Sequence, residues 1–216
     1  MNLVGILRYN NAMVLPKSLE LLIEHFQSLP GIGPKTAERL AFYFLKSNKE
    51  KAKSFALALK SVSEDLRLCS NCHNVSESDL CAICQDSLRR QDLLCVVENP
   101  LNLIAIERTG YSGLYHVLHG VLNPLKGVGI NDLYLDTLIT RVKKLYKKNP
   151  NLELILATNP TMEGESTAMY IKRILINEGL TNLKITRIGR GLPTGGDMEY
   201  ADKSTLDNAL QGRVEF

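Results

Sequence analysis

The sequence predicts an α/β protein in which a mostly parallel sheet follows a helical N-terminal region and a short cysteine-rich segment. Three observations lead to this fold class: apolar residues at helical spacing over residues 18–67, two Cys-x2-Cys pairs within 69–84, and alternating strand-like and helix-like segments from residue 93 onward. We expect four parts: a helical domain over 1–68, a four-cysteine motif over 69–92, an α/β domain over 93–188, and a glycine-rich loop with a short helix over 189–216.

Composition and charge narrow the class of protein. Hydrophobic residues make up 44% of the 216 residues, which suits a globular chain with a sizeable core. Neither a signal peptide nor an apolar run of about 18 residues is evident, so we expect a soluble, cytoplasmic protein without a membrane partner. Residues 1–68 hold ten Lys and Arg against six Asp and Glu. This surplus indicates either a nucleic-acid contact in the N-terminal third or a merely solvated basic surface.

The first two predicted helices flank a tight break at residues 29–34. Ser18 is predicted to cap the first helix, and Pro34 fits the first turn of the second, where its missing N–H costs nothing. The second helix has an apolar face made of Ala37, Leu40, Ala41, Phe44 and Leu45. Phe42 fits packing against another subunit better than stacking on a base. A third helix is expected over 52–67.

The break between these helices has the features of a phosphate-binding hairpin. Gly31 and Gly33 allow another molecule to approach the backbone amides, and the following helix N-terminus adds unpaired N–H groups and the positive end of its dipole. Lys35 and Arg39 are four residues apart and therefore share a face, where they can contact neighbouring phosphates without reading sequence. The block is a helix-hairpin-helix signature and predicts DNA binding; an ordinary helical hairpin with exposed cations is the alternative.

Four cysteines have the spacing of a zinc finger. Cys69, Cys72, Cys81 and Cys84 form two Cys-x2-Cys pairs separated by eight residues, which can close a tetrahedral site around Zn²⁺. Because four thiolates leave no position for water, we expect one structural zinc per chain rather than a catalytic one. His73 is an alternative ligand next to Cys72. Cys95 lies within an apolar strand and is interpreted as a small buried residue.

The α/β region carries polar residues at the ends of its strands. Strands are expected at 93–98, 114–118, 152–158 and 183–188, with helices near 101–108, 132–147, 165–177 and 204–210. Glu98 ends one strand and residues 157–165 follow another. This arrangement resembles the Toprim domain of topoisomerases and primases, where a glutamate and an Asp-x-Asp pair hold Mg²⁺. Here Asn159-Pro160-Thr161 replaces that pair, and neutral side chains are poor ligands for Mg²⁺.

Taken in order, these parts resemble the RecR family of bacterial recombination mediators from about Ser18 to Gly212. The most specific stretches are 29–42, 81–84 leading to 96–98, 115–129, 159–165 and 191–202. The resemblance implies a non-catalytic protein that forms a homo-oligomeric ring, commonly a tetramer, around DNA. It also implies cooperation with RecO and RecF in loading RecA onto single strands coated by the single-strand-binding protein.

The resemblance also assigns roles to individual residues. Lys35 and Arg39 match the positions that face DNA in the family. Glu163 and Glu165 are candidates for the partner surface, although acidic residues also simply favour the start of a helix. Residues 1–17 extend beyond the resemblance and have no assigned function. The competing hypothesis is a Mg²⁺-dependent nuclease or topoisomerase-like enzyme on the Toprim scaffold.

Overall fold

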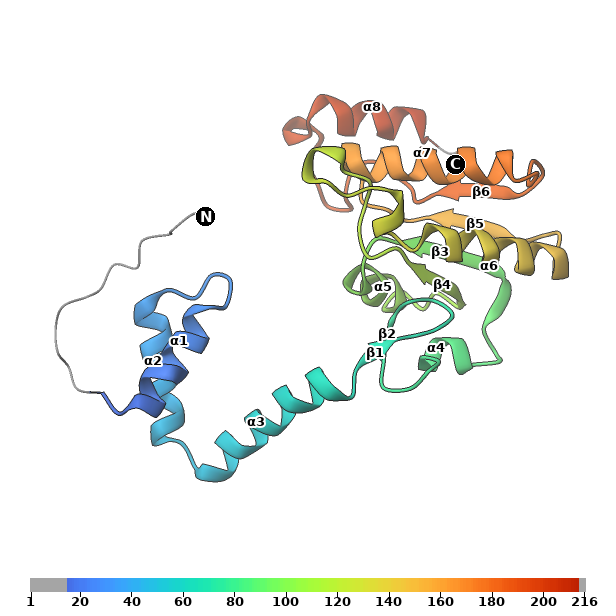
Figure 1. Cartoon of the computed structure of the whole chain (residues 1–216). Coiled ribbons are helices and arrows are strands. Elements are labelled where there is room, and N and C mark those ends of the chain that lie inside the picture. The colour runs from blue at the N-terminus through green and yellow to red at the C-terminus, as the bar shows by residue number, and fades with distance from the viewer. Residues whose placement is uncertain (1–14, 214–216) are drawn as a thin grey trace. The chain divides into compact units, whose positions relative to one another are not determined.

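The computed structural model describes residues 15–213, and the chain divides into two compact units between Asp65 and Leu66. The first unit contains three helices: α1 (Lys17–Gln27), α2 (Pro34–Lys46) and α3 (Lys49–Glu64) (Figure 1). Helices α1 and α2 form a hairpin whose core is made of Ile23, Phe26, Ala37 and Ala41. The two alanines are fully buried and have small side chains, which leaves room for α1 to pack closely on α2.

Three details of the helical unit differ from the sequence prediction. Helix α1 begins at Lys17, so the prediction that Ser18 caps it is wrong: the carbonyl of Pro16 already accepts hydrogen bonds from Leu19 and Glu20. Leu45, predicted on the buried face, is 65% exposed. The third helix spans Lys49–Glu64 instead of 52–67, because the Asn48 side chain caps it at an earlier residue.

The second unit begins with the cysteine-rich segment. Strands β1 (Arg67–Leu68) and β2 (Val75–Ser76) form a short antiparallel hairpin, and the one-turn helix α4 (Ala82–Gln85) follows. The sequence predicts none of these three elements. They are too short to produce a periodic pattern in it.

A four-stranded parallel sheet forms the centre of the second unit, in the order β4-β3-β5-β6. Its strands are β3 (Arg90–Val97), β4 (Gly113–Val117), β5 (Glu153–Leu156) and β6 (Lys184–Arg187). In this register Leu94 lies level with Leu114 on one side and Leu154 on the other. The predicted mostly parallel sheet is confirmed. Because β3 and β5 are neighbours, the residues that follow them lie at the same edge of the sheet.

Helices cover both faces of the sheet (Figure 1). Helices α6 (Leu135–Lys148) and α7 (Met162–Asn177) enclose the larger core, in which Leu94, Val96 and Leu154 meet side chains from both helices. Helix α5 (Pro100–Glu107) packs on the other face against Val97 and Tyr115. Helix α6 starts three residues later than predicted, because residues 130–132 form a separate 3₁₀ turn. Helix α7 starts three residues earlier than predicted, capped by Thr161.

The chain beyond β6 forms an irregular loop, a 3₁₀ turn at Met198–Tyr200 and the short helix α8 (Lys203–Gln211). The Asp202 side chain caps α8 by accepting a hydrogen bond from the backbone N–H of Thr205. The predicted short C-terminal helix is thus confirmed. Between residues 15 and 213, no helix is long and apolar enough to cross a membrane.

Candidate functional site

The hairpin between α1 and α2 presents an open, positively polarised surface. Gly31 has φ +79°, a left-handed conformation that favours glycine, and Gly33 precedes the first turn of α2. A Cβ atom added to either glycine would have no neighbour within 4 Å, so the loop is open to another molecule. The first turn of α2 contains no acidic residue, which leaves the positive end of its dipole free to attract an anion.

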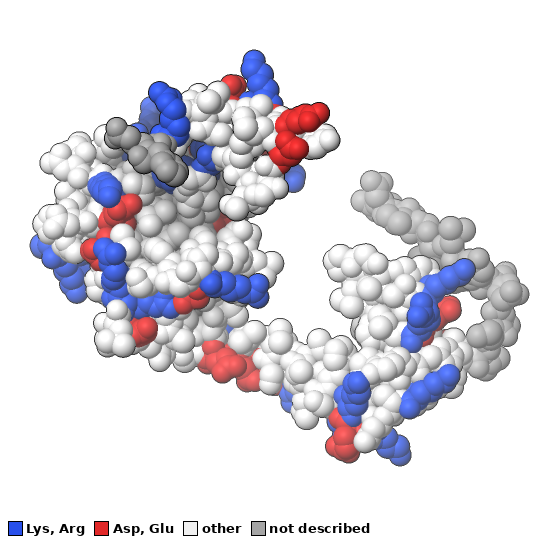
Figure 2. All heavy atoms as spheres, turned by 180° about the vertical axis from the view of Figure 1, so that it is seen from behind, with Lys and Arg blue, Asp and Glu red and all other residues white. Residues whose placement is uncertain are grey.

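Two cations stand beside this loop. Lys35 and Arg39 are both exposed and lie one helical turn apart on α2, as the sequence predicted. On the face of the helical unit shown in Figure 2, Lys and Arg side chains are more prominent than Asp and Glu. The geometry matches what successive phosphates of a nucleic-acid backbone require: open amides next to two flexible positive charges.

The four cysteines of the second unit come together as one cluster. Their sulfur atoms all lie within 4.8 Å of one another, close enough to surround one metal ion. Cys69 follows β1, Cys72 lies in the turn after it, and Cys81 and Cys84 come from the start and body of α4. Three of the four are buried. N–H groups already point at two sulfurs: the backbone of Cys81 donates to Cys69 at 3.3 Å, and the Asn71 side chain donates to Cys84 at 3.4 Å.

His73, the alternative ligand, is engaged elsewhere and does not belong to this cluster. Its Nε2 lies 2.9 Å from the hydroxyl oxygen of Thr137, and its ring stacks on Tyr134 with 3.8 Å between centroids. The donor set therefore consists of four sulfurs, which suits a closed tetrahedral zinc site. Cys95 is separate from the cluster: it lies in β3, is 2% exposed, and its burial raises the pKa of its thiol to about 12.

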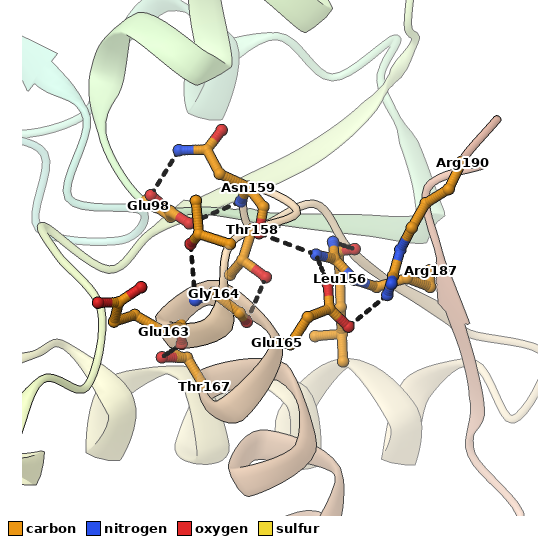
Figure 3. Close-up of polar contacts among 11 residues, drawn as sticks. Glu98, Leu156, Thr158, Asn159, Glu163, Gly164, Glu165, Thr167, Arg187 and Arg190 are labelled. Carbon is orange, nitrogen blue, oxygen red and sulfur yellow. Dashed lines mark hydrogen bonds and ion pairs between the residues drawn. The ribbon is translucent and has the colours of Figure 1, made fainter. Parts of the chain in front are cut away.

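The edge of the sheet holds the glutamate that the sequence singled out. Glu98 directly follows β3 and is 8% exposed. Its Oε1 accepts a hydrogen bond from the backbone N–H of Asn159 at 2.6 Å, and its Oε2 accepts one from Asn159 Nδ2 at 2.7 Å (Figure 3). The Toprim resemblance of the sequence aligns Asn159 with the first aspartate of the metal site in that domain. An amide here donates to the glutamate, whereas a second carboxylate would repel it and recruit a cation.

The start of α7 packs tightly against this pair. The buried hydroxyl of Thr158 donates to the carbonyl of Gly164 at 2.8 Å, and the side chain of Thr161 caps the helix. A Cβ atom added to Gly164 would lie 2.1 Å from the carbonyl oxygen of Asn159 and 2.9 Å from Glu98 Oε1. Glycine is therefore required at this position, where the start of α7 packs directly on Asn159 and Glu98.

The two acidic residues at the start of α7 take part in contacts within the domain. Both carboxylate oxygens of Glu165 are paired, one with Arg187 at 2.6 Å and the other with Arg190 (Figure 3). Although burial raises the pKa of Glu165, the two arginines bring it below its ordinary value. Arg187 also donates to the carbonyls of Leu156 and Asn159, so it holds the end of β5 in place. Glu163 accepts a hydrogen bond from Asn123 at 3.3 Å.

Sequence reasoning did not find Arg187 and Arg190. Arg187 ends β6 and Arg190 lies in the loop after it, 22 and 25 residues beyond Glu165, so no local spacing links them to that residue. Their positive charges pair with Glu165, one of the two residues that the sequence analysis proposed for the partner surface. At this edge a Toprim enzyme needs free anionic oxygens for Mg²⁺. Here those oxygens receive N–H groups from asparagine and arginine instead.

These features together define a class of protein, namely zinc-finger proteins built on a Toprim scaffold. The features are a glycine hairpin beside two cations, a four-cysteine cluster, and a parallel sheet with Glu98 at its edge. Family models match each part in turn: the RecR helix-hairpin-helix over residues 19–63, the RecR zinc finger domain with four cysteines over 66–86, the Toprim domain over 92–189 and the RecR C-terminal region over 191–214. The chain belongs to the RecR family of recombination proteins.

Curated relatives support this membership over nearly the whole chain. The "Recombination protein RecR" of Roseiflexus castenholzii is 47% identical over 208 residues, which are 96% of this chain and 98% of that protein. The protein of the same name from Staphylococcus saprophyticus is 48% identical and covers 94% of this chain over its own full length. The one from Chloroflexus aggregans is 51% identical and covers 90% of this chain. The resemblance predicted from the sequence is confirmed.

Proposed function

We propose that this chain is a non-catalytic, DNA-binding mediator of recombinational repair. It forms a homo-oligomeric clamp, a tetrameric ring, around DNA. With RecO and RecF it helps to load RecA onto single strands coated by the single-strand-binding protein. One observation carries the proposal: both carboxylate oxygens of Glu98 are hydrogen-bonded to Asn159, whereas the glycine hairpin is accessible to another molecule. In this proposal the protein has a DNA-binding surface but lacks the set of carboxylates that would hold a metal ion for DNA cleavage.

The DNA surface in this proposal is the hairpin of the helical unit. Backbone amides near Gly31 and Gly33 contact one phosphate, and Lys35 and Arg39 contact its neighbours. These contacts carry no base information, so binding is independent of sequence. Exposed apolar residues support self-association of the same unit: the 16-residue helix α3 buries none of its side chains, and Phe55, Leu57, Leu59 and Val62 are all exposed. Contact with another subunit would cover them.

The cysteine cluster holds one structural zinc per chain in this proposal. Cys69, Cys72, Cys81 and Cys84 supply the ligands, and the metal supplies folding energy to a segment whose own elements are too short to be stable alone. The start of α7 remains the proposed partner surface. There, Met162 is an exposed side chain available for contact, and Glu163 and Glu165 shape the surface through their internal hydrogen bonds and ion pairs.

A cleavage assay separates the proposed mediator from a Mg²⁺-dependent nuclease or topoisomerase-like enzyme. We expect no cutting, joining or relaxation of supercoiled or linear DNA with Mg²⁺ or Mn²⁺. Catalysis on this scaffold needs carboxylates that bind the metal ion, and both oxygens of the Glu98 carboxylate instead accept hydrogen bonds from Asn159. The control is Glu98→Ala. Metal-dependent activity that is present in the parent protein and disappears in this variant would replace the proposal with the enzyme alternative.

A further inference from the structure

Helix α6 carries a buried cation whose charge has no partner in the described part of the protein. Arg141 is 7% exposed. Its Nη1 donates to the backbone carbonyl of Tyr115 in β4, but its Nη2 is buried without a hydrogen-bond partner. Within residues 15–213, no carboxylate forms an ion pair with this guanidinium. A buried charge in this condition is strongly unfavourable unless an opposite charge lies near it.

The loop between Cys69 and Cys72 lies next to this guanidinium. Arg141 lines a hollow of about 340 Å³ together with Ser70 and Asn71, the two residues between Cys69 and Cys72. Asn71 itself donates to the sulfur of Cys84. The guanidinium thus borders the loop whose Asn71 side chain contacts the cluster.

The cysteine segment is also hydrogen-bonded directly to the strand that Arg141 holds. The backbone N–H of Val117 in β4 donates to the carbonyl of Cys72 at 2.9 Å, and Nε2 of His119 lies 2.6 Å from the carbonyl of His73. Arg141 therefore joins helix α6 to strand β4, and β4 in turn is hydrogen-bonded to the cysteine segment.

The charge of a zinc–thiolate centre indicates a role for the Arg141 guanidinium. Four thiolates around Zn²⁺ carry a net charge of −2, and three of these cysteines are buried. We propose that the Arg141 guanidinium is the counter-charge of the zinc–tetrathiolate centre and a positioning residue that couples this centre to the sheet. The inference rests on the zinc content proposed above. The other charged residues that line the hollow, Asp136 and Lys144, are exposed and therefore screened by water.

The proposal predicts how the thiolates behave without this charge. Electron density on sulfur would be less stabilised, so the thiolates would react faster with alkylating agents and release zinc more readily. Replacing Arg141 with glutamine keeps a donor for the Tyr115 carbonyl but removes the charge, whereas replacing it with lysine keeps the charge. The matched control is Lys144→Gln, which removes an exposed cation from the same hollow.

The experiment uses the full chain, and the zinc content of the parent protein is measured first. For Arg141→Gln we expect zinc release to a chelator and cysteine alkylation to be about 10- to 100-fold faster, by analogy with the loss of metal affinity when an outer-shell group is removed. In the cobalt-substituted protein, the sulfur-to-metal charge-transfer band should move to longer wavelength. Arg141→Lys and Lys144→Gln should stay close to the parent in all three measurements.

A further variant tests the idea if Arg141→Gln does not fold. Thr140 is exposed and lines the same hollow, so Thr140→Glu should compete for the guanidinium without disturbing the core, and should speed alkylation several-fold. Unchanged release, reactivity and spectrum in the folded Arg141→Gln variant, or in Thr140→Glu, would overturn the proposal. So would an Arg141→Lys variant that behaves like Arg141→Gln. A parent protein that contains no zinc would instead contradict the proposed zinc site itself.

Discussion

Replacing Cys72 by serine is expected to remove the zinc and to destabilise the whole unit that begins at Leu66. Cys72 is fully buried, and its backbone carbonyl accepts the hydrogen bond from Val117 that connects the cysteine segment to β4. Structural zinc contributes about 10–16 kcal/mol of apparent binding free energy in zinc-finger peptides, whereas a whole domain is stable by only about 5–15 kcal/mol. Loss of the metal should therefore cost several kcal/mol and leave much of the protein insoluble.

Elemental analysis together with thermal unfolding measures this effect. The matched control is Cys95→Ala, which removes the buried cysteine that lies outside the cluster. That control should keep one zinc per chain and lose only about 1 kcal/mol, as expected for a small side chain removed from a core. A Cys72→Ser variant with the parent's zinc content and melting temperature would show that the cluster does not hold a structural metal.

The double variant Lys35→Ala with Arg39→Ala is expected to lose most of the affinity for DNA. Each lost phosphate contact should flatten the plot of log affinity against log salt by about 0.7–0.9. Two lost contacts then correspond to a fall in affinity on the order of 10- to 100-fold at about 0.1 M salt. Folding should be unaffected, because both side chains are exposed on α2 and neither belongs to the hairpin core.

Salt titrations of DNA binding, with single- and double-stranded DNA of unrelated sequences, measure this loss. The charge-matched control is Lys172→Ala with Arg173→Ala, which removes two exposed cations from α7. It should leave the affinity and the salt slope close to those of the parent. If the hairpin variant stays folded and binds DNA with the parent's affinity and slope, the hairpin is not the DNA surface.

The features predicted best from the sequence are those that depend on the spacing of residues close together in the chain. The cysteine cluster could be predicted because the two metal ligands of each pair are only three residues apart in the sequence. The glycines and cations of the hairpin likewise lie within nine residues of one another. The alternation of strands and helices placed Glu98 and Asn159 at the ends of two strands, and the pairing of β3 with β5 brings those ends together.

The features that could not be predicted depend on contacts between distant residues. No sequence pattern indicates that Asn159 donates to Glu98 across 61 residues, or that Arg187 and Arg190 pair with Glu165. The predicted bounds of α1 and α3 are wrong for a different reason: Pro16 and Asn48 cap these helices a few residues before the predicted starts. The predicted burial of Leu45 is wrong because helical spacing gives the face of a helix but not how much of it a neighbour covers.

The measurement that tests the central claim most directly is RecA loading onto single-stranded DNA coated with the single-strand-binding protein. The assay follows the rate at which RecA replaces that coat, with RecO and RecF present and without nucleolytic loss of the DNA. We predict that the parent protein accelerates loading and that the Lys35→Ala, Arg39→Ala variant does not. Loading that is unchanged by the parent protein, or that is accelerated only when the DNA is cut, would contradict the proposal that this chain is a non-catalytic mediator.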